Sequence, residues 1–172
     1  PLAGVETRLR GDDGTEAAHD ATTIGTLEVR GATVGDGYLN REDATAAATT
    51  ADGWFITGDS ATIGPDGMHR IVGRTSVDII KTGGYKVGAG EVEAAVAEVP
   101  GVHEVAVVGM PDADLGERIV AFVVGDGVHE AGVIAHVAAT LSVHKRPREV
   151  RRVDSLPRNA LGKVQKAQLR DS

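Results

Sequence analysis

The spacing of apolar residues changes at about Arg74, and this change constrains the fold more than any other feature of the sequence. Before it, residues 5–9 and 26–31 alternate between apolar and polar side chains, which is typical of half-buried strands. Pro65-Asp66-Gly67 marks a hairpin turn between two further strands. We therefore predict a small β-barrel or β-sandwich over residues 1–74, with a short alanine-rich helix before the single tryptophan.

Beyond Arg74, the pattern indicates helices mixed with buried strands. Two β-branched apolar runs, residues 105–109 and 119–125, predict adjacent buried strands. Apolar residues at helical spacing predict two helices, with Val92, Ala95, Val96 and Val99 on the first and Ile134, Val137, Ala138 and Leu141 on the second. The fold class is therefore predicted to be α+β, with a second, α+β domain over residues 75–172.

The composition indicates a globular protein without covalent crosslinks. Of its 172 residues, 41% are hydrophobic and 25% are charged, which suits a chain with a buried core. It contains no secretory signal and no apolar run of the roughly 18 residues that a membrane-spanning helix needs, so we expect a cytoplasmic protein without membrane contact. The absence of cysteine excludes disulfides and thiolate zinc sites. Because the chain starts as a strand would and without methionine, we expect it to be part of a longer protein.

Charge is distributed unevenly along the chain. The net charge of -7 argues against a general nucleic-acid-binding protein. From Leu141 onward, nine basic residues outnumber three acidic ones, whereas the rest of the chain carries nine basic and 22 acidic residues. A basic tail suits an anionic small ligand, but it also suits a solvated surface that balances its neighbours. His129, His136 and His144 lack cysteine or carboxylate partners at ligand spacing, so we expect no metal site.

Three short segments combine residue types that suit nucleotide chemistry. They are Trp54-Phe55-Ile56-Thr57-Gly58-Asp59, residues 73–87 with their Gly-Gly pair, and Pro157-Arg158-Asn159-Ala160-Leu161-Gly162-Lys163. Taken singly, each is also an ordinary turn, because glycine, asparagine and proline are common turn formers. A carboxylate such as Asp59 offers two acceptor oxygens to a diol, and Arg74 offers a fork of donors. Lys163 suits a phosphate or a carboxylate.

In this order, the three segments resemble the C-terminal portion of the adenylate-forming superfamily, which includes acyl-CoA synthetases, luciferases and peptide-synthetase adenylation domains. The resemblance covers essentially the whole chain. Residues 76–93, 144–150 and 156–163 are most similar to the malonyl-CoA synthetases, which activate malonate and often methylmalonate. The resemblance implies that residues 1–74 close a large N-terminal domain and that residues 75–172 form a mobile lid domain, with a hinge near residues 74–78.

The resemblance also assigns roles at the hinge and at the nucleotide. It implies that Asp59 binds the ribose hydroxyls of ATP, and that Arg74 contacts the ribose and opens the hinge. Ser76 and Asp78 are the two candidates for the pivot, although Asp78 also suits a local cap or ion pair. Ile56 stands where the family frequently has a basic residue, a departure that leaves the ribose site unchanged.

Two further sites follow from the resemblance. Gly83 and Gly84 are expected to line the tunnel for the pantetheine arm of CoA, because glycine permits close approach to the main chain. Tyr85 and Lys86 come next, and Lys86 is expected to meet a CoA phosphate. Lys163 is the expected catalytic residue, because an ammonium there would stabilise the negative charge that builds when a carboxylate attacks the α-phosphate of ATP. Asn159 replaces the serine or threonine that is common in the family.

The implied reaction uses MgATP, CoA and a small carboxylic acid. The family's phosphate-binding loop and acyl pocket lie upstream of this chain, so we expect the partner to be an N-terminal domain or a companion N-terminal chain. Two alternatives stay open for the enzyme, another acyl- or aryl-CoA ligase and a peptide-synthetase adenylation domain. A third alternative is an isolated, non-catalytic lid that acts as a binding module.

Overall fold

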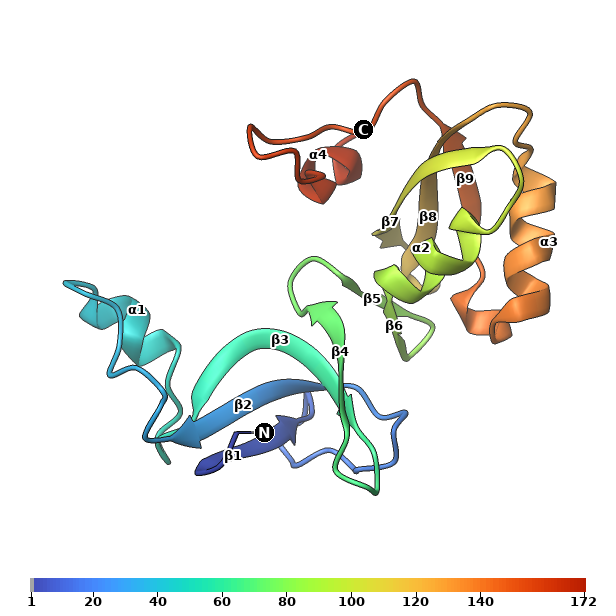
Figure 1. Cartoon of the computed structure of the whole chain (residues 1–172). Helices are drawn as coiled ribbons and strands as arrows, with labels where there is room; N and C mark the ends of the chain where they lie inside the picture. Colours follow the sequence, from blue (N-terminus) through green and yellow to red (C-terminus); the bar gives the residue numbers. More distant parts are fainter. Residues whose placement is uncertain (1) are drawn as a thin grey trace. The chain divides into compact units, whose positions relative to one another are not determined.

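The computed structural model describes residues 2–172, which form two compact units (Figure 1). The first unit spans Pro1–Thr75 and the second spans Ser76–Ser172. The division therefore falls one residue after the boundary that the change in apolar spacing suggested. It also separates the predicted site residues into two groups, Asp59 and Arg74 in the first unit and the others in the second.

The first unit is an antiparallel sheet of four strands in the order β1-β2-β3-β4. The strands are β1 (Val5–Arg10), β2 (Gly25–Gly31), β3 (Phe55–Ile63) and β4 (His69–Arg74), and the short helix α1 (Glu42–Ala47) lies between β2 and β3 in the sequence. The predicted strands, the alanine-rich helix and the hairpin turn are all confirmed. In that turn, the amide of Gly64 donates to the carbonyl of Met68 over 2.9 Å.

This sheet is open, so the prediction of a barrel or a sandwich was wrong for the residues described. Over residues 2–75, the two outer strands β1 and β4 do not pair with each other, and the unit contains a single sheet. The core lies on one face and is small, with Leu9, Leu27, Ala61 and Ile63 at its centre. Alternating apolar residues identify a buried face, but they do not reveal whether four strands curl far enough to close.

Arg8 connects three segments of the first unit. The guanidinium of Arg8 donates to the carboxylate of Glu28 over 2.6 Å and to that of Asp52 over 2.7 Å. It also stacks over the ring of Trp54, 4.3 Å from the ring centre. The hydrogen bond to Asp52 raises the pKa of Arg8, and the same bond lowers the pKa of Asp52 well below its usual range. Arg8 thus joins β1 and β2 to the turn that leads into β3, the strand that carries Asp59.

The second unit is an α+β domain, as predicted. Its sheet contains β5 (Ile79–Thr82), β6 (Tyr85–Gly88), β7 (Val102–Asp112) and β8 (Gly116–Gly125), in the order β6-β5-β8-β7, with β9 (Glu149–Arg152) parallel to β8. Its helices are α2 (Ala89–Ala97), α3 (Glu130–Thr140), the 3₁₀ turn η1 (Val143–Lys145) and α4 (Lys166–Arg170). The two predicted apolar runs lie in β7 and β8, which pair antiparallel over their whole length.

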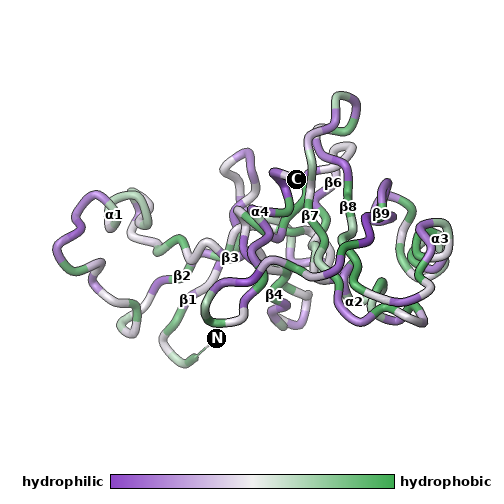
Figure 2. The backbone as a smooth tube through the Cα atoms, turned by 90° about the horizontal axis from the view of Figure 1, so that it is seen from above, coloured by the Kyte–Doolittle hydropathy of each residue, from purple (hydrophilic) through white to green (hydrophobic). Residues whose placement is uncertain are grey.

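Both faces of the β7–β8 ladder are covered, which explains the continuous apolar runs. Figure 2 shows hydrophobic stretches along parts of both strands. One face packs against α2 and α3 and includes Val107, Ile119, Ala121 and Val123. The opposite face, with Ala106, Val108, Val120 and Phe122, packs against Leu156 and Leu169 of the C-terminal segment. The segment that carries Lys163 is therefore fixed to the face of the sheet that the helices leave open.

The predictions for this unit needed one correction and missed several short elements. Val92, Ala95 and Val96 are buried on α2 as predicted, and Val137 is buried on α3 as predicted. The other buried residue of α3 is Val133, which was not predicted. Ala138, which we predicted on that face, is exposed. The sequence analysis did not identify β9, η1 or α4, because each is only three to five residues long and too short to show a clear pattern. Among residues 2–172, the structure contains no helix with the length and hydrophobicity to cross a bilayer.

Candidate functional site

Asp59 and Arg74 face each other across two neighbouring strands of the first unit. They are register partners in the β3–β4 pair, and Oδ1 of Asp59 lies 3.2 Å from Nε of Arg74. The guanidinium also donates from Nη1 to the carbonyl of Thr57 over 3.0 Å. Both side chains reach the surface, where the exposed fractions are 33% for Asp59 and 60% for Arg74. The two residues predicted to bind the ribose are thus adjacent, with an acceptor beside a donor.

The backbone before Asp59 makes room for this pair. Gly58 has a φ of +74°, a value that side chains disfavour. A Cβ atom on Gly58 would lie 3.3 Å from Nη1 of Arg74. The hydroxyl of Thr57 donates to the carbonyl of Leu27 and accepts from the amide of Asp59. These contacts connect the backbone at Asp59 to the neighbouring strand β2.

The two pivot candidates have different surroundings. Thr75 belongs to the first unit, because its amide donates to Gly58 and its hydroxyl is 2.8 Å from that of Ser60. Asp78 belongs to the second unit: its carbonyl accepts from the amide of Ala89 over 2.7 Å, and its carboxylate accepts from Lys166 over 2.7 Å. Ser76 lies between these anchored residues and is exposed.

The Gly-Gly pair forms the tight turn of the β5–β6 hairpin. Gly83 and Gly84 have φ values of +55° and +81°. A Cβ atom on Gly84 would meet no atom within 4 Å, so the turn faces open space. Within this hairpin, Tyr85 pairs with Thr82, and Lys86 pairs with Lys81 on the neighbouring strand. The loop predicted to line a tunnel is thus an exposed edge of the second unit.

A groove of about 370 Å³ lies beside this hairpin, and it contains residues to which the sequence analysis gave no role. The ring of Tyr85 stacks on that of His144, with the ring centres 4.2 Å apart and the planes 13° from parallel. Gly83, Arg146 and Arg148 also line the groove, whereas Gly84 and Lys86 do not. The basic run at residues 144–148 was the available signal, but the sequence does not show that it lies beside the Gly-Gly turn. An aromatic stack with two arginines suits a planar, anionic ligand.

Lys163 ends a turn that is held by several hydrogen bonds. The side-chain oxygen of Asn159 accepts from the amides of Leu161 and Lys163, over 3.0 and 2.9 Å. The guanidinium of Arg158 donates to the carbonyl of Gly162 over 2.7 Å and pairs with the carboxylate of Glu104 on β7. Asparagine therefore supplies the side-chain acceptor that serine or threonine would supply at this position.

The side chain of Lys163 itself is exposed. Between residues 2 and 172, the structure records no hydrogen bond or ion pair for its ammonium group. By contrast, the ammonium of Lys166, three residues later, lies within 2.8 Å of two carboxylates. Lys163 thus presents an unpaired cation on a hydrogen-bonded turn, which suits contact with an external anion.

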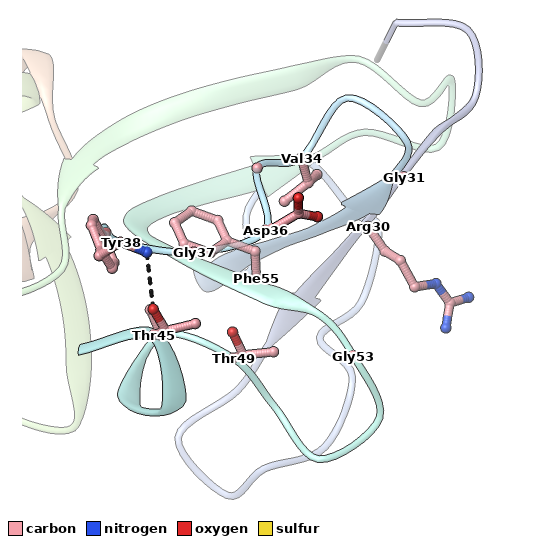
Figure 3. A pocket seen from close by; sticks show the side chains of 12 residues that line it. Arg30, Gly31, Val34, Asp36, Gly37, Tyr38, Thr45, Thr49, Gly53 and Phe55 are labelled. Carbon is pink, nitrogen blue, oxygen red and sulfur yellow. Dashed lines mark hydrogen bonds between the residues drawn. The ribbon is translucent and has the colours of Figure 1, made fainter. Parts of the chain in front are cut away.

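A further pocket in the first unit contains none of the predicted site residues. It measures about 200 Å³ and lies between α1 and the sheet, next to Tyr38, Thr45 and Phe55 (Figure 3). The amide of Tyr38 donates to the hydroxyl of Thr45, and both residues line this pocket. For the part of the chain that the structure describes, no group of three or more His, Asp or Glu side chains is placed to hold a metal ion.

Comparison with known proteins gives matches along the whole chain. Residues 91–163 match the family described as the AMP-binding enzyme C-terminal domain. A relative from Mycobacterium tuberculosis, the 3-[(3aS,4S,7aS)-7a-methyl-1,5-dioxo-octahydro-1H-inden-4-yl]propanoyl:CoA ligase, is 44% identical over 99% of this chain and 32% of its own length. The mitochondrial malonate–CoA ligase ACSF3 of Mus musculus is 38% identical over 98% of this chain and 32% of its own length.

A solved structure agrees with these relatives. The crystal structure of ATP-bound MatB from Rhodopseudomonas palustris superposes with a TM-score of 0.83 at 40% identity, covering 99% of this chain and 34% of that one. The chain thus spans about a third of the length of the proteins that it matches.

The turn before Lys163 provides a test of this geometry. We expect Asn159→Ala to speed hydrogen exchange of the amides of residues 159–164 by about 2- to 10-fold, because each lost hydrogen bond contributes roughly 0.5–1.5 kcal/mol. Asn159→Asp keeps the acceptor oxygen and serves as the control, with exchange close to that of the unaltered protein. Equal exchange in the Asn159→Ala variant and the unaltered protein would contradict the role of Asn159.

Proposed function

We propose that the chain carries the C-terminal domain of the AMP-binding enzymes, whose family model matches residues 91–163, and that the full-length protein is an ATP-dependent acid–thiol ligase of the cytoplasm. In this proposal, residues 1–74 close a large N-terminal domain, and residues 75–172 form a lid that serves both steps of the reaction. The observation that carries the proposal is the unpaired ammonium of Lys163 on its hydrogen-bonded turn, within the segment that matches this family.

In the first step, a carboxylate oxygen attacks the α-phosphorus of ATP, and pyrophosphate leaves to give an acyl-adenylate. Asp59 accepts hydrogen bonds from the ribose hydroxyls, and Arg74 donates to a ribose oxygen. The 3.2 Å separation of Asp59 and Arg74 supports this shared role. Lys163 stabilises the negative charge that develops on the phosphate and the carboxylate. Mg²⁺ would enter as the partner of the triphosphate in this proposal.

In the second step, the sulfur of CoA attacks the acyl carbon, and AMP leaves with its phosphate. Gly83 and Gly84 line the path of the pantetheine arm, and their exposed turn supports this role. The adjacent groove supports CoA as the thiol, because CoA carries an adenine nucleotide. The Tyr85–His144 stack suits its purine, and Arg146 suits a phosphate. Lys86 follows Tyr85 on β6 but does not line the groove, and it contributes a positive charge to this edge.

The lid turns about Ser76 in this proposal. The flanking residues are each bonded within a unit: Thr75 to Gly58 in the first, and Asp78 to Ala89 in the second. A change of backbone angles at Ser76 therefore breaks neither of these bonds. This arrangement favours Ser76 over Asp78 as the pivot, because movement at Asp78 would disturb the start of α2. Rotation then exchanges Lys163 for the Gly83–Gly84 turn at the reaction centre.

The acid is malonate or methylmalonate in our proposal. Similarity to the malonate–CoA ligase of Mus musculus along nearly the whole chain supports this choice. The ligase from Mycobacterium tuberculosis, which is named for a larger, fused-ring acid, is similar to a comparable degree and favours the alternative of another acyl-CoA ligase. The acid pocket is expected upstream of residue 1, in an N-terminal domain or a companion chain, so substrate assays must decide.

We expect the full-length protein, with its N-terminal part in one chain or added as a second, to catalyse ATP–pyrophosphate exchange. Malonate or methylmalonate should support faster exchange than acetate or a fatty acid. The fastest exchange with another acid would overturn the assigned substrate and leave the ligase activity standing. No exchange with any acid would overturn the ligase and favour a binding module instead.

Two substitutions should damage opposite halves of the reaction. In the full-length protein, Lys163→Ala should slow adenylation by roughly 100- to 1000-fold, the typical loss for one transition-state contact. It should spare thioester formation from supplied acyl-adenylate. Gly84→Leu should do the reverse because its side chain blocks the thiol path, while Gly84→Ala controls for strain at positive φ. If Lys163→Ala and Gly84→Leu slowed the same half-reaction, the two-step role of the lid would be contradicted.

A proline at the pivot should restrict the rotation. Ser76→Pro fixes φ near -65° and limits the preceding residue, so we expect the overall turnover to fall by about 10-fold or more, the size of a modest conformational barrier. At least one half-reaction, measured alone, should stay within about 2-fold of its normal rate. Ser76→Ala keeps the backbone free and should have normal turnover. Normal turnover of Ser76→Pro would place the pivot elsewhere.

A further inference from the structure

The helix that follows Lys163 is attached to the hinge segment by two of its side chains. Lys166, the first residue of α4, donates from Nζ to Oδ1 of Asp78 over 2.7 Å. Arg170, the last residue of α4, donates from Nη2 to the carbonyl of Val77 over 3.1 Å. Between them, Leu169 is buried in the apolar cluster on the sheet. One short helix thus fastens the C-terminal segment to residues 77 and 78.

Lys166 also reaches the core of the second unit. Its Nζ lies 2.8 Å from Oε1 of Glu93 on α2. The same oxygen of Glu93 accepts a hydrogen bond from the amide of Val107 on β7 over 2.8 Å. The backbone carbonyl of Asp78 accepts a hydrogen bond from the amide of Ala89 at the start of α2. A single ammonium group therefore connects the hinge segment, α2, β7 and the segment that carries Lys163.

Because this cluster is partly buried, its two carboxylates depend on the ammonium of Lys166 as their shared cation. The side chain of Lys166 is only 12% exposed, and those of Asp78 and Glu93 are 27% and 24% exposed. Without the ammonium, two partly buried carboxylates would lose their shared cation, and removal of one partner from a buried ion pair is strongly unfavourable. The other ion pair of the Lys163 turn, Arg158 with Glu104, is 43% and 42% exposed and is screened by solvent.

We infer that Lys166 is a positioning residue for the adenylation step: it fixes the Lys163 turn to Asp78 and Glu93, so that rotation at the hinge carries Lys163 as part of a rigid body. This inference rests on the proposed function. Lys166 does not contact the substrates in this account, and its ammonium is occupied by protein carboxylates. Its effect on the reaction passes through the placement of Lys163, where a misplacement of about 1 Å costs roughly 100-fold in rate.

The test is Lys166→Met in the full-length protein, which keeps the length of the side chain and removes the charge. We expect kcat for ATP–pyrophosphate exchange to fall by about 10- to 100-fold. The KM for ATP should stay within about 2-fold, because Asp59 and Arg74 lie in the other unit. Thioester formation from supplied acyl-adenylate should change by less than about 3-fold, a loss too small to reflect a misplaced catalytic group. Lys166→Arg retains a cation and should recover most of the exchange activity.

Two comparisons separate positioning from a loss of stability. Arg118→Met removes a cation from another partly buried pair of the same unit, with Glu149 at 3.3 Å, and it should leave kcat for exchange unchanged. Asp78→Asn weakens the same cluster, so the double variant Lys166→Met/Asp78→Asn should be no slower than Lys166→Met alone. The inference would be wrong if the Lys166→Met variant catalysed ATP–pyrophosphate exchange at the normal rate. It would also be wrong if this variant slowed both half-reactions equally, or lost no more activity than the Arg118→Met variant.

Amide hydrogen exchange distinguishes a failure of this inference from a failure of the proposed ligase function. In Lys166→Met, amides of residues 159–170 should exchange faster than in the unaltered full-length protein, whether or not it shows ligase activity. If the unaltered protein were inactive with every acid, the proposed function would fail, and unchanged exchange of these amides would overturn the attachment itself. Faster amide exchange with normal adenylation would retain the attachment and overturn its role in positioning Lys163.

Discussion

The antiparallel pairing of β7 with β8 is the interaction on which the second unit depends. The ladder runs from the pair Val102 and Gly125 to the pair Asp112 and Gly116. Because side chains alternate across a strand, one ladder offers two apolar faces. The helices α2 and α3 cover one face, and the C-terminal segment covers the other. The turn of Lys163 packs on this ladder through Leu156 and Leu169, and the hairpin of Gly83 pairs with β8, so the ladder connects the two.

Each unit also uses a cation shared between two carboxylates to join segments that are distant in sequence. Arg8 does so with Glu28 and Asp52, and its side chain is 13% exposed. Lys166 does so with Asp78 and Glu93 at 12% exposure. Two partners offset the cost of removing the cation from water, which a single partner often fails to do. In both units, the cluster lies next to an element that carries a candidate site residue.

The candidate site residues differ in how firmly the fold holds them. Asp59 and Arg74 are register partners in a sheet, which fixes their separation. Lys163 lies on a turn at the surface, and its position depends on Asn159, Arg158 and the anchoring of α4. In the proposed function, the first unit holds the nucleotide while the second changes position between the two steps. A mobile group needs a rigid base if rotation is to deliver it to one place.

The sequence alone determined the α+β class, most strands, the hairpin turn at Pro65 and the change of pattern near Arg74, because these follow from local periodicity and turn chemistry. It also pointed to Asp59, Gly83 and Lys163, through motifs whose residues are close in the chain. Only the tertiary structure decided that the first sheet stays open, since closure depends on strand number and curvature. It alone placed the basic run at residues 144–148 beside the Gly-Gly turn. It alone paired Lys166 with Asp78, 88 residues away, because ion pairs between distant segments leave no periodic trace in the sequence.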